Sequence, residues 1–207
     1  MKTDRTILHR AAAATLAGLI LTSVATAAVA AEFGDDDVDV NVEIAQIDQP
    51  GVLAMTVAGT SVQLTEGGST PTIRQFTGTL PTVTVTDTRT AAEIPDGSGW
   101  YVLGTSTDFT GDAGQPTISA GNLGWTPRLI DGGESGQVAE GDHVDTVLDS
   151  GDDAVGLVDQ ELLALASDSE AIAPEGQWTA NAQLVLKTAS TVQSGSYGST
   201  LTLSLFE

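Results

Sequence analysis

The sequence predicts an all-β fold: an antiparallel β-sandwich, Greek-key-like, with little or no helix after the first thirty residues. The strongest indication is a period of two in one C-terminal stretch. Its apolar residues are Trp178, Ala180, Ala182, Leu184 and Leu186. Such alternation is typical of a strand with one face on a core and the other in water. A second indication is the series of short threonine- and valine-rich stretches separated by Gly, Pro and Asp turns.

A second alternating stretch lies at the end of the chain. Its inward parity is Tyr197, Ser199, Leu201, Leu203 and Leu205, after a turn-rich break at residues 193–196. Two alternating strands around a short Gly/Ser break predict an antiparallel pair. We therefore expect residues 178–186 and 197–205 to form a hairpin that closes the domain, with its leucines on the core.

Residues 1–30 have the three parts of a secretory signal peptide. Lys2, Arg5 and Arg10 precede an apolar run, and residues 28–30 read Ala-Val-Ala, an A-x-A cleavage site. An uncleaved membrane anchor is the alternative. The run is alanine-rich, however, and its strongest part is shorter than the ~20 apolar residues of a spanning helix. We expect cleavage after Ala30 and a single secreted domain over residues 31–207.

The remaining strands are expected in chain order, with one domain and no repeat. Residues 158–166 contain three leucines that fit either a helix or a buried strand, and we favour a strand or a single turn. Residues 111–124 are glycine-rich and irregular. The other stretches with strand character are residues 38–44, 53–57 with a short continuation at 62–64, 76–80, 83–85, 100–103 and 144–148.

The chain is strongly acidic, with 28 acidic residues, 7 basic residues and a formal net charge of −21. The signal segment carries three bases and one acid, so the remainder is at −23 with four fixed cations. Nucleic acid and anionic membrane both require clustered Lys and Arg. We therefore expect neither as a partner. There is no cysteine, so a lipid anchor on cysteine is excluded.

The sequence offers little for catalysis. His143 is the one histidine after the signal segment, and no G-x-S-x-G elbow occurs. A Ser-His-Asp site built on His143 with Asp142 or Asp145 stays open, although an exposed loop histidine is favoured. A carboxylate pair for glycoside hydrolysis cannot be identified from spacing. The prediction is a protein without enzymatic activity.

No cofactor is predicted, and calcium is left open because it binds carboxylate oxygens. The acids do not fit the D-x-D-x-D-G loop, since a loop starting at Asp149 would place Ala154 at position six and Gln160 at position twelve. An acidic loop exposed to solvent is the simpler interpretation. The densest cluster of acids is Asp142, Asp145, Asp149, Asp152, Asp153 and Asp159.

Aromatic residues make up only 4% of the chain and lie near strand starts. They are interpreted either as core residues at the ends of a sandwich or as rings that stack on the sugars of a wall polymer. The core interpretation is favoured. The candidate binding residues are Trp100, Tyr101, Trp125, Trp178 and Tyr197.

The order of several segments resembles that of WxL-type cell-surface domains, in particular the exported variants of high-GC Gram-positive bacteria. The resemblance covers nearly all of the chain after the signal segment. Two positions depart from the motif. Trp100-Tyr101-Val102 has its leucine one place late, and Leu203-Ser204-Leu205 lacks the tryptophan. The segments are residues 80–89 (LPTVTVTDTR), 99–103 (GWYVL), 107–109 (TDF), 163–166 (LALA), 178–186 (WTANAQLVL) and 195–203 (GSYGSTLTL).

The resemblance implies non-covalent attachment to the cell wall through peptidoglycan, in complexes with other surface proteins. We therefore expect a secreted, non-enzymatic surface protein whose partner is peptidoglycan or wall polysaccharide. The alternative is a secreted structural subunit of a fibre or coat, assembled with partner surface proteins. A carbohydrate-active enzyme is a third, less favoured hypothesis.

Overall fold

The computed structural model describes residues 42, 50–151 and 154–207. The chain divides into two compact units, Met1–Gln46 and Ile47–Glu207, and every strand and helix described belongs to the second. The predicted signal peptide lies outside the described residues, as does the strand expected over 38–44 apart from Val42. About 45% of the described residues are in strands and 6% are helical. The all-β, sandwich-like fold is therefore confirmed.

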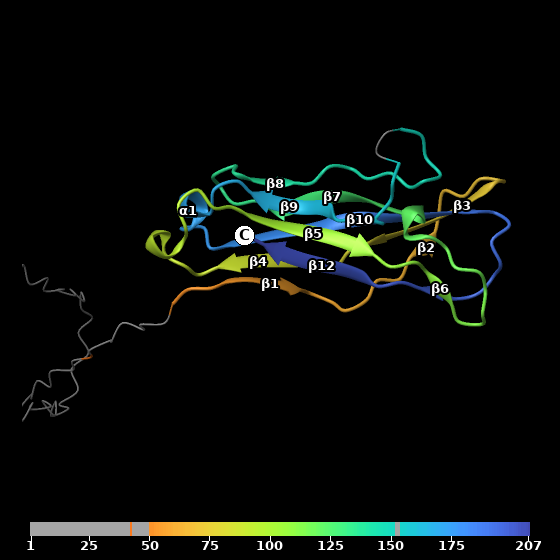
Figure 1. Cartoon of the computed structure of the whole chain (residues 1–207), viewed down its shortest axis with the longest axis horizontal. Helices are drawn as coiled ribbons and strands as arrows, with labels where there is room; N and C mark the ends of the chain where they lie inside the picture. The colour runs from red at the N-terminus through yellow and green to blue at the C-terminus, as the bar shows by residue number, and fades with distance from the viewer. Residues whose placement is uncertain (1–41, 43–49, 152–153) are drawn as a thin grey trace, which may run out of the picture. The chain divides into compact units, whose positions relative to one another are not determined.

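Two antiparallel sheets form the layers, and Figure 1 shows the smaller sheet in front of the long strand β10. A two-stranded ribbon joins β11 (Tyr197–Gly198) to β6 (Thr110–Gly111), and the short helices are η1 (Ala91–Glu93), η2 (Ala120–Asn122) and α1 (Ser169–Ile172). The larger sheet consists of β1 (Leu53–Val57), β4 (Val83–Asp87), β10 (Gln177–Ala189), β3 (Ile73–Thr79), β2 (Thr65–Glu66) and β7 (Leu123–Asp131). The smaller sheet consists of β12 (Leu201–Phe206), β5 (Trp100–Ser106), β9 (Glu161–Ala166) and β8 (Val138–Glu140).

Strand β10 organises the larger sheet. One edge of this 13-residue strand pairs first with β4 and then with β3, and its other edge pairs with β7. Between β3 and β4 the ladder continues through the N–H of Leu80, which donates to the carbonyl of Ala182 at 2.8 Å. Pro81 follows at once. Because proline has no N–H to donate, it fits the break between the two strands.

The core lies between the two sheets. The predicted inward parity of β10 is confirmed, since all of its members from Trp178 to Leu186 are buried. They pack with inward residues of the smaller sheet, among them Trp100, Val102 and Leu163, in one apolar cluster. Leu201 and Leu203 also face this cluster, but they are only half-buried because β12 is an edge strand.

The predicted C-terminal hairpin is wrong. Strand β12 pairs with β5 in the smaller sheet, whereas β10 belongs to the larger one. Residues 190–200 cross from one sheet to the other and contribute β11 on the way. The physical reason is that alternation identifies the buried face of a strand but not its neighbour. Two strands with facing apolar sides satisfy the same pattern as two strands side by side.

Other expectations have mixed outcomes. Residues 158–166 contain the strand β9, as favoured, and the strands around Pro81 and at residues 53–57 and 100–103 are confirmed. The strand expected over 144–148 is wrong. Val144 makes a single bridge to Trp125, and the following turn is held by Asp149, which accepts from the backbone and side chain of Thr146. Residues 62–64 form no strand, and the sequence did not predict β7 or β8.

Candidate binding surfaces

The three tryptophans lie in the core. Trp100, Trp125 and Trp178 are 1%, 0% and 2% exposed, and the rings of Trp100 and Trp178 lie 5.5 Å apart at 41°. The indole N–H of Trp178 donates to Glu175 at 2.7 Å. These positions fit the favoured core interpretation. In this conformation none of the three indoles presents a face on which a sugar could stack.

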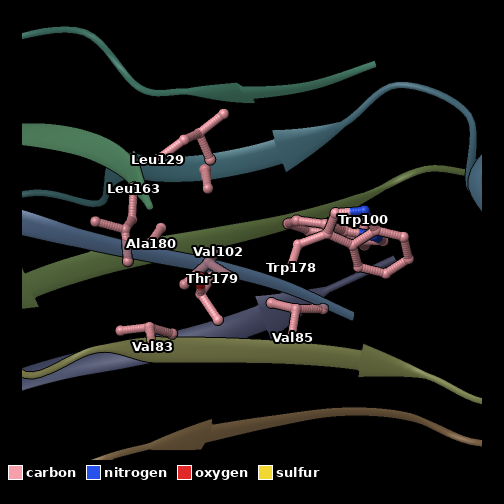
Figure 2. A pocket seen from close by; sticks show the side chains of 10 residues that line it. Val83, Val85, Trp100, Val102, Leu129, Leu163, Trp178, Thr179 and Ala180 are labelled. Carbon is pink, nitrogen blue, oxygen red and sulfur yellow. The ribbon is translucent and has the colours of Figure 1, made fainter. Parts of the chain in front are cut away.

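Figure 2 shows Trp100 and Trp178 at one end of a void inside this core. The void measures about 10 Å³ and is lined by apolar side chains such as Val83, Val102 and Leu163. A cavity of this size is at the lower limit for one water molecule, and water also needs polar partners. The void is therefore a small packing defect between the sheets and no ligand site.

Tyr101 and Phe206 form an exposed aromatic pair on the outside of the smaller sheet. Their centroids are 5.3 Å apart with the rings 17° from parallel, and the residues are 39% and 37% exposed. The pairing of β12 with β5 sets Phe206 beside Tyr101, and β9 sets Leu165 on the other side of Tyr101. We call the outward set Tyr101, Phe206, Leu103, Leu162 and Leu165 the aromatic face.

A cleft of about 450 Å³ opens between the two sheets, towards the end of the domain where β2, β3 and β6 lie (Figure 1). Small-ligand sites occupy about 300–1,000 Å³. We call this space the intersheet cleft. Its apolar lining includes Val62, Leu64, Phe76, Phe109, Ile118, Leu123, Leu184, Leu186, Val192, Tyr197 and Leu201, and its polar lining includes Gln63, Arg74, Ser106, Thr188, Gln193, Ser194, Ser196 and Ser199.

Tyr197, the fifth aromatic candidate, lines this cleft. Its hydroxyl donates to the carbonyl of Gln193 at 2.8 Å, and its ring packs half-buried against the core. The five candidates thus fall in three places: the core, the aromatic face and the cleft. Sequence reasoning missed Phe206 and the cleft, because both depend on which strands pair.

Arg74 stands at the rim of the intersheet cleft. Its guanidinium carbon lies 5.1 Å from the ring centroid of Phe76. Its Nε and Nη2 donate to the two carboxylate oxygens of Glu66 at 3.0 and 2.7 Å. The hydrogen bond from Arg74, helped by one from Ser69, lowers the pKa of Glu66 to about 2. Glu66 is therefore ionised at neutral pH.

His143 belongs to a hydrogen-bond network on the surface, of which the sequence suggested the contact with Asp145 but not the contact with Thr126. Its Nε2 lies 2.9 Å from Asp145, and its Nδ1 lies 2.7 Å from the hydroxyl of Thr126. Thr126 lies on β7, 17 residues before His143 in the chain. The imidazole side chain is 52% exposed. The hydroxyl, imidazole and carboxylate stand on an open surface, whereas nucleophilic catalysis relies on a water-excluded site with oriented donors.

Two acids of the predicted cluster pair with different partners. Asp145 contacts His143, and Asp149 pairs with Lys187. Burial raises the pKa of Asp149, but the hydrogen bonds from Lys187 and Thr146 outweigh it and leave the pKa lowered. Within residues 50–151 and 154–207, no three side chains of His, Cys, Asp or Glu are grouped to hold a metal ion. Asp152 and Asp153 lie outside the described residues.

No helix in the described part of the chain is long and apolar enough to cross a membrane. Comparison with protein-family models, with curated proteins and with solved structures found no match. The candidate surfaces are therefore interpreted from their own geometry.

Proposed function

We propose that this is a secreted, non-enzymatic cell-surface protein that associates non-covalently with the Gram-positive cell wall, through peptidoglycan or wall polysaccharide. The observation that supports it is the stacked pair Tyr101 and Phe206, two exposed rings lying 17° from parallel. Large apolar rings that stay in solvent on a sheet face favour contact with a partner. In such a stacked pair, the ring faces that the two side chains do not cover remain available to the C–H face of a sugar.

The net charge predicts how such binding responds to salt. A chain near −23 repels anionic wall polymers at long range, and salt screens that repulsion. Contacts made by the two rings are not screened. We therefore expect binding to strengthen from low salt to ~0.15 M, where the Debye length is about 8 Å. Binding through basic residues would weaken instead.

Sedimentation with purified cell walls tests the proposal. Replacing Tyr101 and Phe206 with serine should weaken wall binding about tenfold or more, since exposed aromatic anchors dominate such contacts. Thr202→Ala is the matched control, because Thr202 is exposed on the outward parity of β12. Unchanged binding in the double variant would overturn the assignment to the aromatic face. Repeating the sedimentation with a chelator shows whether divalent cations bridge the acidic residues of the protein to wall phosphates.

The alternative, a subunit that assembles with other surface proteins, is supported by a different feature of the same face. Leu103, Leu162 and Leu165 extend it beyond the rings, and the edges of β8 and β12 carry no further strand within the described residues. Open sheet edges beside an apolar face are sites where another chain can add. Absence of wall binding at any salt, with concentration-dependent assembly in light scattering, would favour this function.

A further inference from the structure

The intersheet cleft changes from polar to apolar from its rim inwards. The register of β3 and β10 sets Arg74 opposite Thr188, Phe76 opposite Leu186, and Gly78 opposite Leu184. Because alternate residues share a face, the lining members of these rungs follow one another into the cleft. The exposed fraction falls along the same direction, from 37% for the Arg74 side chain to 7% for Leu186 and 2% for Leu184.

The charge of the cleft is unlike that of the chain. The protein carries 28 acids against 7 bases, yet none of the described residues that line the cleft is acidic, and Arg74 is the single charged one among them. The other polar lining groups are amides and hydroxyls, including Thr188, Ser196 and Ser199. This composition suits an apolar ligand body with one negative or hydrogen-bond-accepting end.

Arg74 has N–H groups that its contact with Glu66 does not use. A guanidinium has five N–H groups in a planar fork. Two of its nitrogens donate to Glu66, whereas Nη1 has no hydrogen-bond partner among the residues that the structure describes. Phe76 fixes the guanidinium from one face. Arginine presented in this way binds carboxylate and phosphate oxygens well. Glu66 would compete with such a ligand.

We propose that the intersheet cleft binds a single-chain amphiphile with an anionic head, such as a long-chain carboxylate. The apolar chain lies along Phe76, Leu186 and Leu184, and the head meets Arg74 at the rim. This site is separate from the aromatic face, which lies on the outside of the smaller sheet, so the proposal does not depend on wall binding.

Isothermal titration with decanoate and with decanol, both below their aggregation concentrations, tests the proposal. Decanoate should bind saturably with one site, and decanol about tenfold more weakly because it lacks the charge that pairs with Arg74. Arg74→Ala should remove this preference. Arg128→Ala is the matched control, since Arg128 is an exposed arginine that does not line the cleft.

Glu66→Gln is expected to change decanoate affinity in the direction opposite to Arg74→Ala. It frees the Arg74 fork from a carboxylate that is ionised at pH 7, so decanoate should bind several-fold more tightly while decanol changes little. A variant that merely disturbed the cleft would weaken both ligands. Urea midpoints of the variants show whether each is folded before it is titrated.

Three outcomes would overturn the proposal. No saturable binding of decanoate means that the cleft takes no amphiphile. Equal affinity for decanoate and decanol means that the head is not recognised. Tighter binding of an uncharged apolar hexapeptide, unaffected by Arg74→Ala, would assign the cleft to an extended peptide instead. Wall sedimentation of Arg74→Ala should be unchanged in each case, which keeps this test distinct from that of the proposed function.

Discussion

The buried ion pair between Arg89 and Asp87 is expected to be the most sensitive polar contact of the domain. The Asp87 side chain is 0% exposed and accepts from Nε and Nη2 of Arg89 at 2.9 and 2.7 Å. The same guanidinium donates through Nη1 to Glu207, just past the end of β12, at 2.7 Å. Arg89 thus joins the end of β4 in the larger sheet to the end of β12 in the smaller one.

Arg89→Ala should lower the free energy of unfolding by about 3 kcal/mol, the lower end of the 3–5 kcal/mol typical of an uncompensated buried charge. The lower end applies because Asp87 keeps one donor, the backbone N–H of residue 89 at 3.0 Å. Removing both charges, in the double variant Asp87→Asn with Arg89→Met, should cost about 1 kcal/mol or less, since well-packed neutral replacements of buried pairs are often neutral.

Arg74→Ala provides the control for geometry. Arg74 binds Glu66 through the same two-pronged contact, but both side chains are exposed, so its loss should shift the midpoint far less than Arg89→Ala. Urea unfolding at pH 7 is the assay, because urea is uncharged and does not screen ion pairs. Equal shifts for Arg89→Ala and Arg74→Ala would refute the reasoning, as would a double variant less stable than Arg89→Ala.

Three further predictions concern the core, pH and export. Leu184→Ala should cost ~2–5 kcal/mol as a buried large-to-small change, whereas Thr202→Ala should stay within about 0.5 kcal/mol; equal urea midpoints would contradict the assigned faces. Glu175→Ala should cost ~1–3 kcal/mol at pH 7 by leaving the buried N–H of Trp178 unpaired. The Trp178 hydrogen bond lowers the pKa of Glu175 in the folded protein. The stability that the ionised carboxylate contributes is therefore complete above about pH 4.3, the usual pKa of glutamate, and is lost as the pH falls through the pKa of the folded state. Over that pH range, the difference in unfolding free energy between the wild type and Glu175→Gln should disappear. Mass spectrometry of secreted protein should find the N-terminus at Ala31 or within a few residues, and an intact initiator methionine would contradict cleavage.

The faces of the strands could be predicted from the sequence, but their partners could not. In β10 five inward residues in strict alternation made the buried side unmistakable, from Trp178 to Leu186. The same pattern holds for β5, where Trp100 points inward and Tyr101 outward. Strand β7 was missed because Gly124 and Pro127 interrupt its composition. Backbone hydrogen bonds place β7 beside β10, and the pattern of side chains along a strand does not predict such pairing.

The candidate surfaces depend on these pairings, and this explains why tryptophan was a poor guide to them. A bulky ring at a strand start favours a core position but is also compatible with a binding face. The parity of the strand separates the two, because Trp100 and its neighbour Tyr101 must lie on opposite sides of β5. Phe206 joins Tyr101 only because β12 crosses to the smaller sheet. The segment that makes this crossing also contributes Val192, Tyr197 and Ser199 to the lining of the cleft, together with Leu184 and Leu186 of β10. One misassigned partner strand therefore conceals both surfaces at once.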